Sequence, residues 1–129
     1  MPKKVVAIRR KTLRMILEAS KDTDRPNDPK EFFAILRAEE GVIEELLLLP
    51  GTVSGDVHAI FQLHMLPIDF SVVGTIHSHP SESYNPSDAD RQLFAHFGRV
   101  HIIVGHPYTE RTWRAYDHDG KPRAMDIVP

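Results

Sequence analysis

The sequence predicts an α+β fold in which two helices pack on a mixed or mainly antiparallel β-sheet. First, apolar residues recur at helical spacing in two segments, one near residues 10–21 and one near residues 86–98. Second, six to eight shorter segments have the length and composition of strands. Third, Asp119-Gly120 separates two such segments, which is typical of a β-hairpin. This mixture of elements favours helices layered on one sheet.

Size and composition indicate a globular protein with a single domain, residues 1–129. Hydrophobic residues make up 41% of the chain and charged residues 26%. The net charge of −2 gives no support for a nucleic-acid or membrane partner. There is no cysteine, which excludes disulfides and thiolate metal sites. Neither a signal peptide nor an apolar run of roughly 20 residues is present, so we expect a cytoplasmic location.

The first predicted helix is "RKTLRMILEASK", which has a stripe of apolar side chains at Leu13, Ile16 and Leu17. The following segment, 22–29, is rich in turn-forming residues and should end this helix. The apolar residues 5–8 before it are either an edge strand or the lead-in to the helix.

The remaining elements are mostly strands. We predict strands at 31–38, 42–50, 57–63, 70–79 and 99–107. The strand at 70–79 reads as largely buried, and side-chain alternation puts His77 and His79 on one side of it. The second helix begins at Pro86 and Ser87, and Gly98 is suited to end it.

The segment "HSHPSESYNPSDAD" (77–90) contains the candidate metal-binding residues. His77 and His79 point the same way from a strand end, and Asp90 lies early in a helix that can fold back over that end. Two imidazoles and one carboxylate suit zinc, whose ligands bind at about 2.0–2.2 Å. Three protein ligands leave a fourth position for water, as in catalytic zinc sites, and zinc lowers the pKa of such a water to about 7.

Other interpretations of the same residues exist. Two histidines one residue apart arise by chance in a chain with eight, and Ser87-x-x-Asp90 is close to a helix capping box. Two histidines and a carboxylate also bind non-haem iron. Histidines at the end of a buried strand are costly without partners, which favours a metal site over either structural interpretation. No cosubstrate site for iron is apparent, so zinc is favoured.

The spacing His77-x-His79, seven residues, then Ser87-x-x-Asp90 resembles the H-x-H-x7-S-x-x-D signature of the JAMM (MPN+) metallopeptidases. The order of elements, through "HIIVGHPY" at 101–108, is similar to that of the small archaeal JAMM proteins. The resemblance implies a curved, mixed β-sheet flanked by helices and related to the cytidine deaminases.

The resemblance also implies residue roles. His77, His79 and Asp90 would hold one zinc ion per chain, and Ser87 would donate a hydrogen bond to the oxyanion or the water. Glu31, in "DPKEFFAIL", would be the general base. Charge and spacing alone do not distinguish Glu31 from the other acids of this region, Glu39, Glu40, Glu44 and Glu45.

The implied reaction is zinc-dependent cleavage of the isopeptide bond that joins the Gly-Gly end of a ubiquitin-like modifier to lysine. Two alternatives stay open: release of a C-terminal amino acid from a sulfur-carrier protein, and a non-catalytic MPN-type binding module. Segments 64–70 and 81–86 are candidate flanks of the channel for the Gly-Gly tail. The remaining histidines have no metal-ligand spacing and are interpreted as structural: His58, His64, His96, His101, His106 and His118.

Overall fold

The computed structural model describes residues 4–48, 71–80 and 84–129. The predicted strand 57–63, the segment 64–70 and residues 81–83 lie outside the described residues. The elements are β1 (Ala7–Arg9), α1 (Arg10–Thr23), β2 (Asp24–Arg25), β3 (Asp28–Pro29), β4 (Phe33–Glu39), β5 (Val42–Leu47), β6 (Val72–His79), α3 (Asp88–His96), β7 (Val100–Gly105), β8 (Trp113–Tyr116), β9 (Pro122–Arg123) and β10 (Asp126–Val128).

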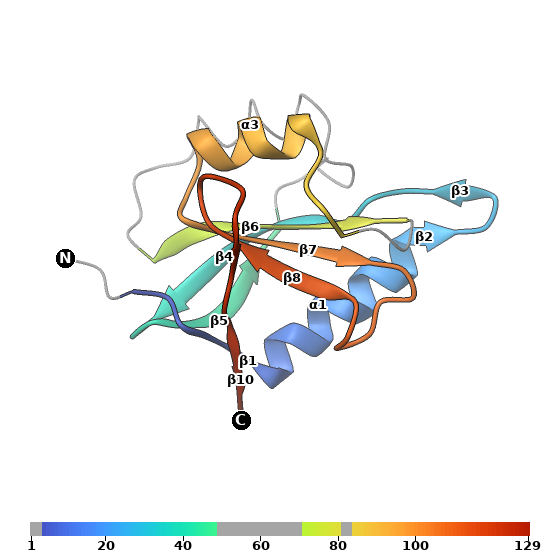
Figure 1. Cartoon of the computed structure of the whole chain (residues 1–129). Helices are drawn as coiled ribbons and strands as arrows, with labels where there is room; N and C mark the ends of the chain where they lie inside the picture. The colour runs from blue at the N-terminus through green and yellow to red at the C-terminus, as the bar shows by residue number, and fades with distance from the viewer. Residues whose placement is uncertain (1–3, 49–70, 81–83) are drawn as a thin grey trace.

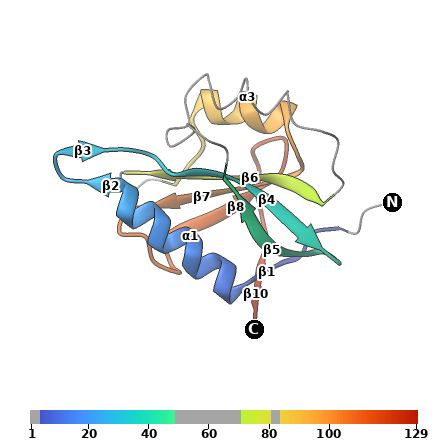
Figure 2. The same cartoon turned by 180° about the vertical axis from the view of Figure 1, so that it is seen from behind.

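A mixed sheet forms the centre of the described structure. Its order is β10-β1-β5-β4-β6-β7-β8-β9, and β2 and β3 form a separate two-stranded hairpin. Parallel pairs join β6 to β7 and β1 to both of its neighbours, whereas the remaining neighbours are antiparallel. The sheet curves, with α3 on one face and α1 on the other (Figures 1 and 2). The predicted α+β fold is therefore confirmed, including the curved, mixed sheet flanked by helices.

Each helix covers its own apolar layer. The predicted stripe of α1 is buried and packs against one face of the sheet, with Ala34, Leu36, Ile76, Ile102 and Val104 among its partners. On the other face, Leu93 and Phe94 of α3 pack on Phe33, Ile35, Ile103 and Tyr116. Alternation along the strands sends odd-numbered residues of β4 and β7 toward α3, and also those of β6 from Thr75 onward; before that point a register shift between β4 and β6 puts Val73 on the α1 side.

The position of β1 differs from the expectation of an edge strand. It lies between β5 and β10, because Asp126–Val128 at the far end of the chain pairs along its outer side. This strand also leads directly into α1, as the alternative interpretation of residues 5–8 required. Within the described residues, no helix is long and apolar enough to cross a membrane.

Two glycines allow α3 and β7 to pack closely on β6. Gly98 has a φ of +76° just after α3, which agrees with its predicted role in ending the helix. A β-carbon at Gly98 would lie 2.7 Å from the Gly74 α-carbon, and one at Gly74 would lie 1.5 Å from the carbonyl oxygen of Val100. Side chains at these two positions would push β7 away from β6, the strand that carries both histidines of the motif.

Candidate metal centre

The C-terminal end of β6 positions His77 and His79. β6 is held on both sides, since His77 pairs with Phe33 of β4 and with Ile103 of β7. His77 faces α3, where its ring lies 6.4 Å from that of Phe94, and it is only 2% exposed. His79 lies one alternation further along the same face and is half-buried. The two imidazoles are therefore fixed by a central strand.

Three side chains converge at this point. His77 Nε2 lies 3.1 Å from His79 Nε2 and 2.9 Å from Asp90 Oδ1, and His79 Nε2 lies 3.2 Å from Asp90 Oδ2. The potential ligand atoms of these three residues all lie within 4.8 Å of one another. Among the described residues, this is the group of side chains that could hold a metal ion. The structure thus brings together the three predicted ligands.

The spacing of these atoms suits a small tetrahedral cation. Ligands at 2.0–2.1 Å from a tetrahedral zinc lie about 3.3 Å from one another, close to the separations in this group. Two imidazole nitrogens and a carboxylate are also the donor types that zinc accepts. The residues present therefore fit the ion in both geometry and chemistry.

Asp90 has a second role at the start of α3. The Ser87 amide donates to Asp90 Oδ2 at 2.8 Å, and the Asp90 amide donates to Ser87 Oγ at 3.1 Å. This is a complete capping box, so the structural interpretation of Ser87-x-x-Asp90 is correct and compatible with a metal site. Burial alone would raise the pKa of Asp90, but the hydrogen bonds to His77 and His79, the charge of His77 and the hydrogen bond from the Ser87 amide outweigh burial and lower it.

Glu31 lies just before β4, on the side of the metal-binding group. The register pairs Phe33 with His77, and its continuation by two residues puts Glu31 across from His79 and on the same face. The segment before β4 and the end of β6 remain adjacent at this point, because the Ser78 amide donates a hydrogen bond to the Phe32 carbonyl at 3.0 Å. Glu31 is half-buried, and its carboxylate is not among the three converging groups.

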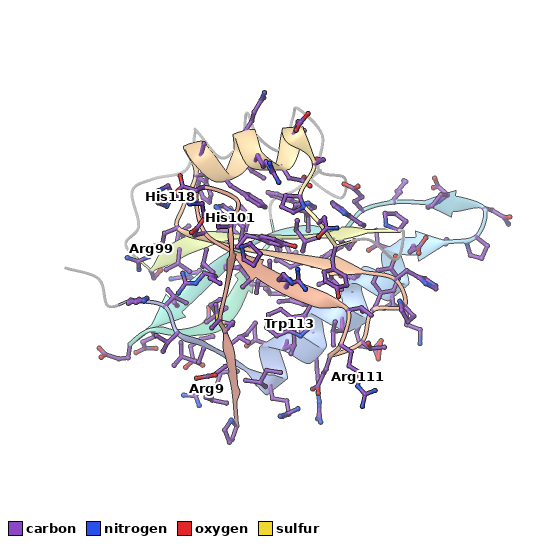
Figure 3. The ribbon with its side chains drawn as sticks, in the orientation of Figure 1. Arg9, Arg99, His101, Arg111, Trp113 and His118 are labelled. Atoms are coloured by element: carbon purple, nitrogen blue, oxygen red, sulfur yellow. The ribbon has the colours of Figure 1, made fainter. Side chains whose placement is uncertain are left out.

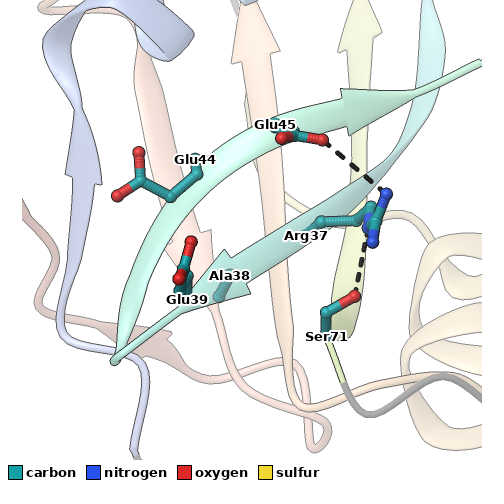
Figure 4. Close-up of a pocket in the computed structure, with 6 residues that line it drawn as sticks. All are labelled: Arg37, Ala38, Glu39, Glu44, Glu45 and Ser71. Carbon is teal, nitrogen blue, oxygen red and sulfur yellow. Dashed lines mark hydrogen bonds and ion pairs between the residues drawn. The ribbon is translucent and has the colours of Figure 1, made fainter.

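The four acids that competed with Glu31 lie at the other end of β4 and β5. Arg37 pairs with Val72 at the beginning of β6, and its guanidinium lies 3.7 Å from Glu45 and donates to Ser71 Oγ at 3.0 Å (Figure 4). Glu44 binds Arg9 through both carboxylate oxygens. The cavity of about 230 Å³ that Glu39, Glu44 and Glu45 line is therefore remote from the histidines.

A buried histidine lies behind the centre. His101 is paired with Thr75 across β6 and β7, and its Nδ1 is hydrogen-bonded to Thr75 Oγ1 at 2.7 Å. Its ring stacks on Phe94 at 4.2 Å, between the sheet and α3 (Figure 3). Burial, followed by the charge of His77, lowers the pKa of His101 to about 3, although carbonyl groups at the end of α3 act in the opposite direction. His101 is therefore structural, as predicted, and neutral at physiological pH.

A tyrosine and an arginine support the segment that leads to Ser87. The Tyr116 hydroxyl, on β8, donates to the Tyr84 carbonyl at 2.6 Å. The guanidinium of Arg114 lies over the ring of Tyr84, 5.2 Å from its centre. Burial raises the pKa of Tyr116; Arg114 lowers it, whereas the charges of Tyr84 and Asp90 raise it. Tyr116 therefore lies within electrostatic range of both Arg114 and Asp90.

Sequence reasoning did not find Arg114 or Tyr84. Trp113 to Tyr116 alternate as a strand should, but only the register with β7 reveals which side of β8 faces the histidines. Of the other histidines interpreted as structural, His106 and His118 are exposed, and His58 and His64 lie outside the described residues.

Comparison with known proteins agrees with this geometry. Residues 7–116 match the model of the family described as prokaryotic homologs of the JAB domain. The chain belongs to this family. A Haloferax volcanii protein described as "Probable metalloprotease" is 40% identical over 136 residues, which cover 98% of this chain and 81% of that protein.

Solved structures resemble the chain over almost its whole length. A JAB1/MPN domain protein from Archaeoglobus fulgidus matches with a TM-score of 0.75 and 39% identity, covering 96% of this chain and all of the other. A structure described as "JAMM: A Metalloprotease-like Zinc Site in the Proteasome and Signalosome" matches with a TM-score of 0.75 and 36% identity, covering 98% and 100%. The fold is that of JAB1/MPN domains of the JAMM type, as the sequence motif implied.

Proposed function

We propose that this protein is a zinc-dependent isopeptidase that cleaves the amide bond between the C-terminal Gly-Gly of a ubiquitin-like modifier and a lysine side chain. The observation that carries the proposal is the convergence of His77 Nε2, His79 Nε2 and the Asp90 carboxylate on one point. The relatives described as a probable metalloprotease and as a metalloprotease-like zinc site support the same chemistry.

In this proposal, His77, His79 and Asp90 hold one zinc ion. The ion would supply Lewis acidity to the scissile carbonyl and to a water molecule. Glu31 accepts a proton from the water as its oxygen bonds to the carbonyl carbon, and Ser87 donates a hydrogen bond to the developing oxyanion. The carbon–nitrogen bond then breaks, and Glu31 returns the proton to the departing lysine amine.

The capping box supports the role given to Ser87. Its Oγ accepts a hydrogen bond from the Asp90 amide, so the hydroxyl hydrogen is directed away from the helix and is available to a ligand. The strand register, continued by two residues from the pair of Phe33 and His77, puts Glu31 across from His79, which supports its role as the base.

The substrate assignment depends on the shape of a Gly-Gly tail. Such a tail can lie extended against protein backbone, and its lack of side chains lets it enter a narrow channel. Of the candidate flank 81–86, the structure describes residues 84–86, and the Tyr116 hydroxyl donates a hydrogen bond to the Tyr84 carbonyl there.

The test is cleavage of a purified modifier–lysine conjugate by the zinc-loaded protein. We expect cleavage after Gly-Gly that stops on addition of a chelator and in the variant His79→Ala. The matched control is His118→Ala, which removes an exposed imidazole from the β8–β9 turn and should leave both cleavage and metal content unchanged. Metal analysis should find about one zinc per chain. Cleavage that persists in the chelator, or an intact conjugate with every zinc-loaded sample, would overturn the proposal.

A further inference from the structure

We infer that Ser78 and Tyr108 are positioning residues that fix Glu31, the proposed general base, relative to the metal-binding group. The inference rests on the proposed function, in which Glu31 exchanges a proton with water and with the departing amine. Both residues act on the backbone that carries Glu31 rather than on the substrate. Ser78 holds the chain directly after Glu31, and Tyr108 holds the hairpin that precedes it.

Glu31 lies in a short stretch of backbone between two strands. β3 ends at Pro29 and β4 begins at Phe33, so the three residues between them belong to neither strand. The β2–β3 hairpin before this stretch projects beyond the main sheet (Figure 1). Backbone outside the strand ladder moves easily unless other contacts hold it. A base in this stretch therefore keeps a constant distance to the histidines only if the chain is anchored on both sides of it.

The first anchor is a pair of hydrogen bonds between Ser78 and Phe32. The Ser78 amide donates to the Phe32 carbonyl at 3.0 Å, and the Phe32 amide donates to Ser78 Oγ at 2.8 Å. In a regular antiparallel pair, the second of these bonds would go to a backbone carbonyl. The Ser78 hydroxyl therefore takes the place of a ladder bond at the residue next to Glu31.

Ser78 lies between the two histidines in the sequence but points away from them. The histidines face α3, whereas Ser78 alternates to the opposite side of β6 and has no exposed surface. Its partner on β7, Val104, and its hydrogen-bond partner, Phe32, both belong to the apolar layer that packs with α1. Ser78 thus links the strand of the metal-binding group to the segment of Glu31 from the side opposite the site.

The second anchor is the hydroxyl of Tyr108, which donates to Asp24 Oδ2 at 2.5 Å. Asp24 pairs with Pro29 across the hairpin, so this bond holds the hairpin two residues before Glu31. Tyr108 is itself buried in the core on the α1 side. Burial raises the pKa of Tyr108, and the hydrogen bond to Asp24 and the charges of Asp24 and Glu31 raise it further. The hydroxyl therefore lies within electrostatic range of Glu31 and stays protonated.

Both anchors come from the central strands that also hold the metal-binding group. Ser78 is part of β6, and Tyr108 follows the end of β7 by three residues. Loss of either anchor should let Glu31 shift relative to the histidines. A displacement of about 1 Å is enough to lower a rate by about 10²-fold.

The experiment measures cleavage of the modifier–lysine conjugate by zinc-loaded variants. Ser78→Ala removes the acceptor for the Phe32 amide, and we expect kcat to fall by about 10²-fold while KM and zinc content keep their wild-type values. Ser78→Thr retains the hydroxyl and should restore most of kcat. In the Glu31→Gln background, Ser78→Ala should cause no further loss, because the base on which Ser78 acts is already absent.

The matched control is Ser20→Ala, the same substitution at an equally buried position of α1. Among the described residues, the Ser20 hydroxyl has no hydrogen-bond partner, so kcat should not change. Tyr108→Phe tests the second anchor, since it retains the buried ring and removes the bond to Asp24; we expect kcat to be about 10-fold lower at unchanged KM. This variant carries the test if Ser78→Ala does not fold.

Three results would overturn the inference. An equal loss of kcat from Ser78→Ala with and without Glu31→Gln would show that Ser78 acts on another group. A loss of zinc from Ser78→Ala that accounts for the lost activity would show that it acts on the metal ligands. Wild-type kcat in both Ser78→Ala and Tyr108→Phe would show that neither anchor matters.

A second measurement locates Glu31 without turnover, so the inference and the proposed function can fail separately. Cobalt in place of zinc broadens the NMR signals of nearby nuclei, with a steep dependence on distance. With isotope-labelled glutamate, the broadening of the Glu31 side-chain signal should be the same in the wild type and in Ser20→Ala, and should change in Ser78→Ala and in Tyr108→Phe. If the wild type cleaves no conjugate, the proposed reaction fails while this change still supports the anchors; equal broadening in all four proteins rejects them.

Discussion

The buried histidine behind the metal centre should make the protein sensitive to acid. His101 has no exposed surface, and its pKa is about 3 in the folded protein against 6.5 for a free imidazole. Between these values the unfolded chain binds a proton that the folded chain does not. The free energy of unfolding therefore falls as pH decreases through this window.

The size of the effect follows from the two pKa values. One bound proton changes the free energy of unfolding by about 1.4 kcal/mol per pH unit. From well above pH 6.5 down to pH 4.5, the loss attributable to His101 is about 2.7 kcal/mol. Asp90 does not contribute to this part of the curve, because its pKa is lowered and its stabilising effect is lost only under more acidic conditions.

The assay is urea unfolding of the metal-free protein at several pH values between 7.5 and 4.5, for the wild type and for His101→Gln. A chelator is included so that loss of bound metal at low pH does not contribute to the measured change in the free energy of unfolding. Glutamine can retain a hydrogen bond to Thr75 but does not titrate, so the variant should show a shallower dependence on pH whatever its stability at pH 7.5. Equal slopes for the two proteins would refute the assignment of a buried, neutral His101.

Three further outcomes follow from the site. Glu31→Gln should retain zinc but lower kcat by about 10²–10⁴-fold, since a general base contributes that factor. Unchanged turnover, or a loss of zinc measured by atomic absorption, would contradict the role of Glu31 as the base. Ser87→Ala should cost about 1 kcal/mol in urea unfolding and about 10²-fold in kcat, and Ser87→Thr should restore the stability. Gly74→Ala should destabilise the protein by about 2 kcal/mol or more, because its methyl group meets the Val100 carbonyl; a change below 0.5 kcal/mol in urea would show that β7 moves freely.

Much of the site was predictable because its parts are local in the sequence. His77, His79, Ser87 and Asp90 fall within 14 consecutive residues, and strand alternation plus a helix-start pattern suffice to bring them together. The capping box and the metal-binding group were treated as rival interpretations of Ser87-x-x-Asp90. In the structure the Asp90 carboxylate completes the capping box and also lies in the candidate metal-binding group, so the two interpretations are compatible.

Pairing between strands that are far apart in the sequence was harder to predict. Pairing of β10 with β1 joins the two ends of the chain, and no feature of residues 5–8 indicates it. Glu31 was selected by family resemblance alone, because its position across from His79 depends on a register between strands more than 40 residues apart. For the same reason, the sequence alone did not indicate which face of the sheet Arg114 lies on, since only its pairing with Ile103 determines that face.

The shared use of Asp90 affects how substitutions in this protein should be compared. Replacing Asp90 removes a candidate ligand and the acceptor for the Ser87 amide in a single change. Replacing Ser87 with alanine removes only the acceptor for the Asp90 amide and leaves the carboxylate intact. The stability lost on replacing Asp90 should therefore be measured with and without zinc, because the lost protein contacts are common to both states and the difference isolates the share that the ion contributes; Ser87→Ala, which spares the carboxylate, is the matched control.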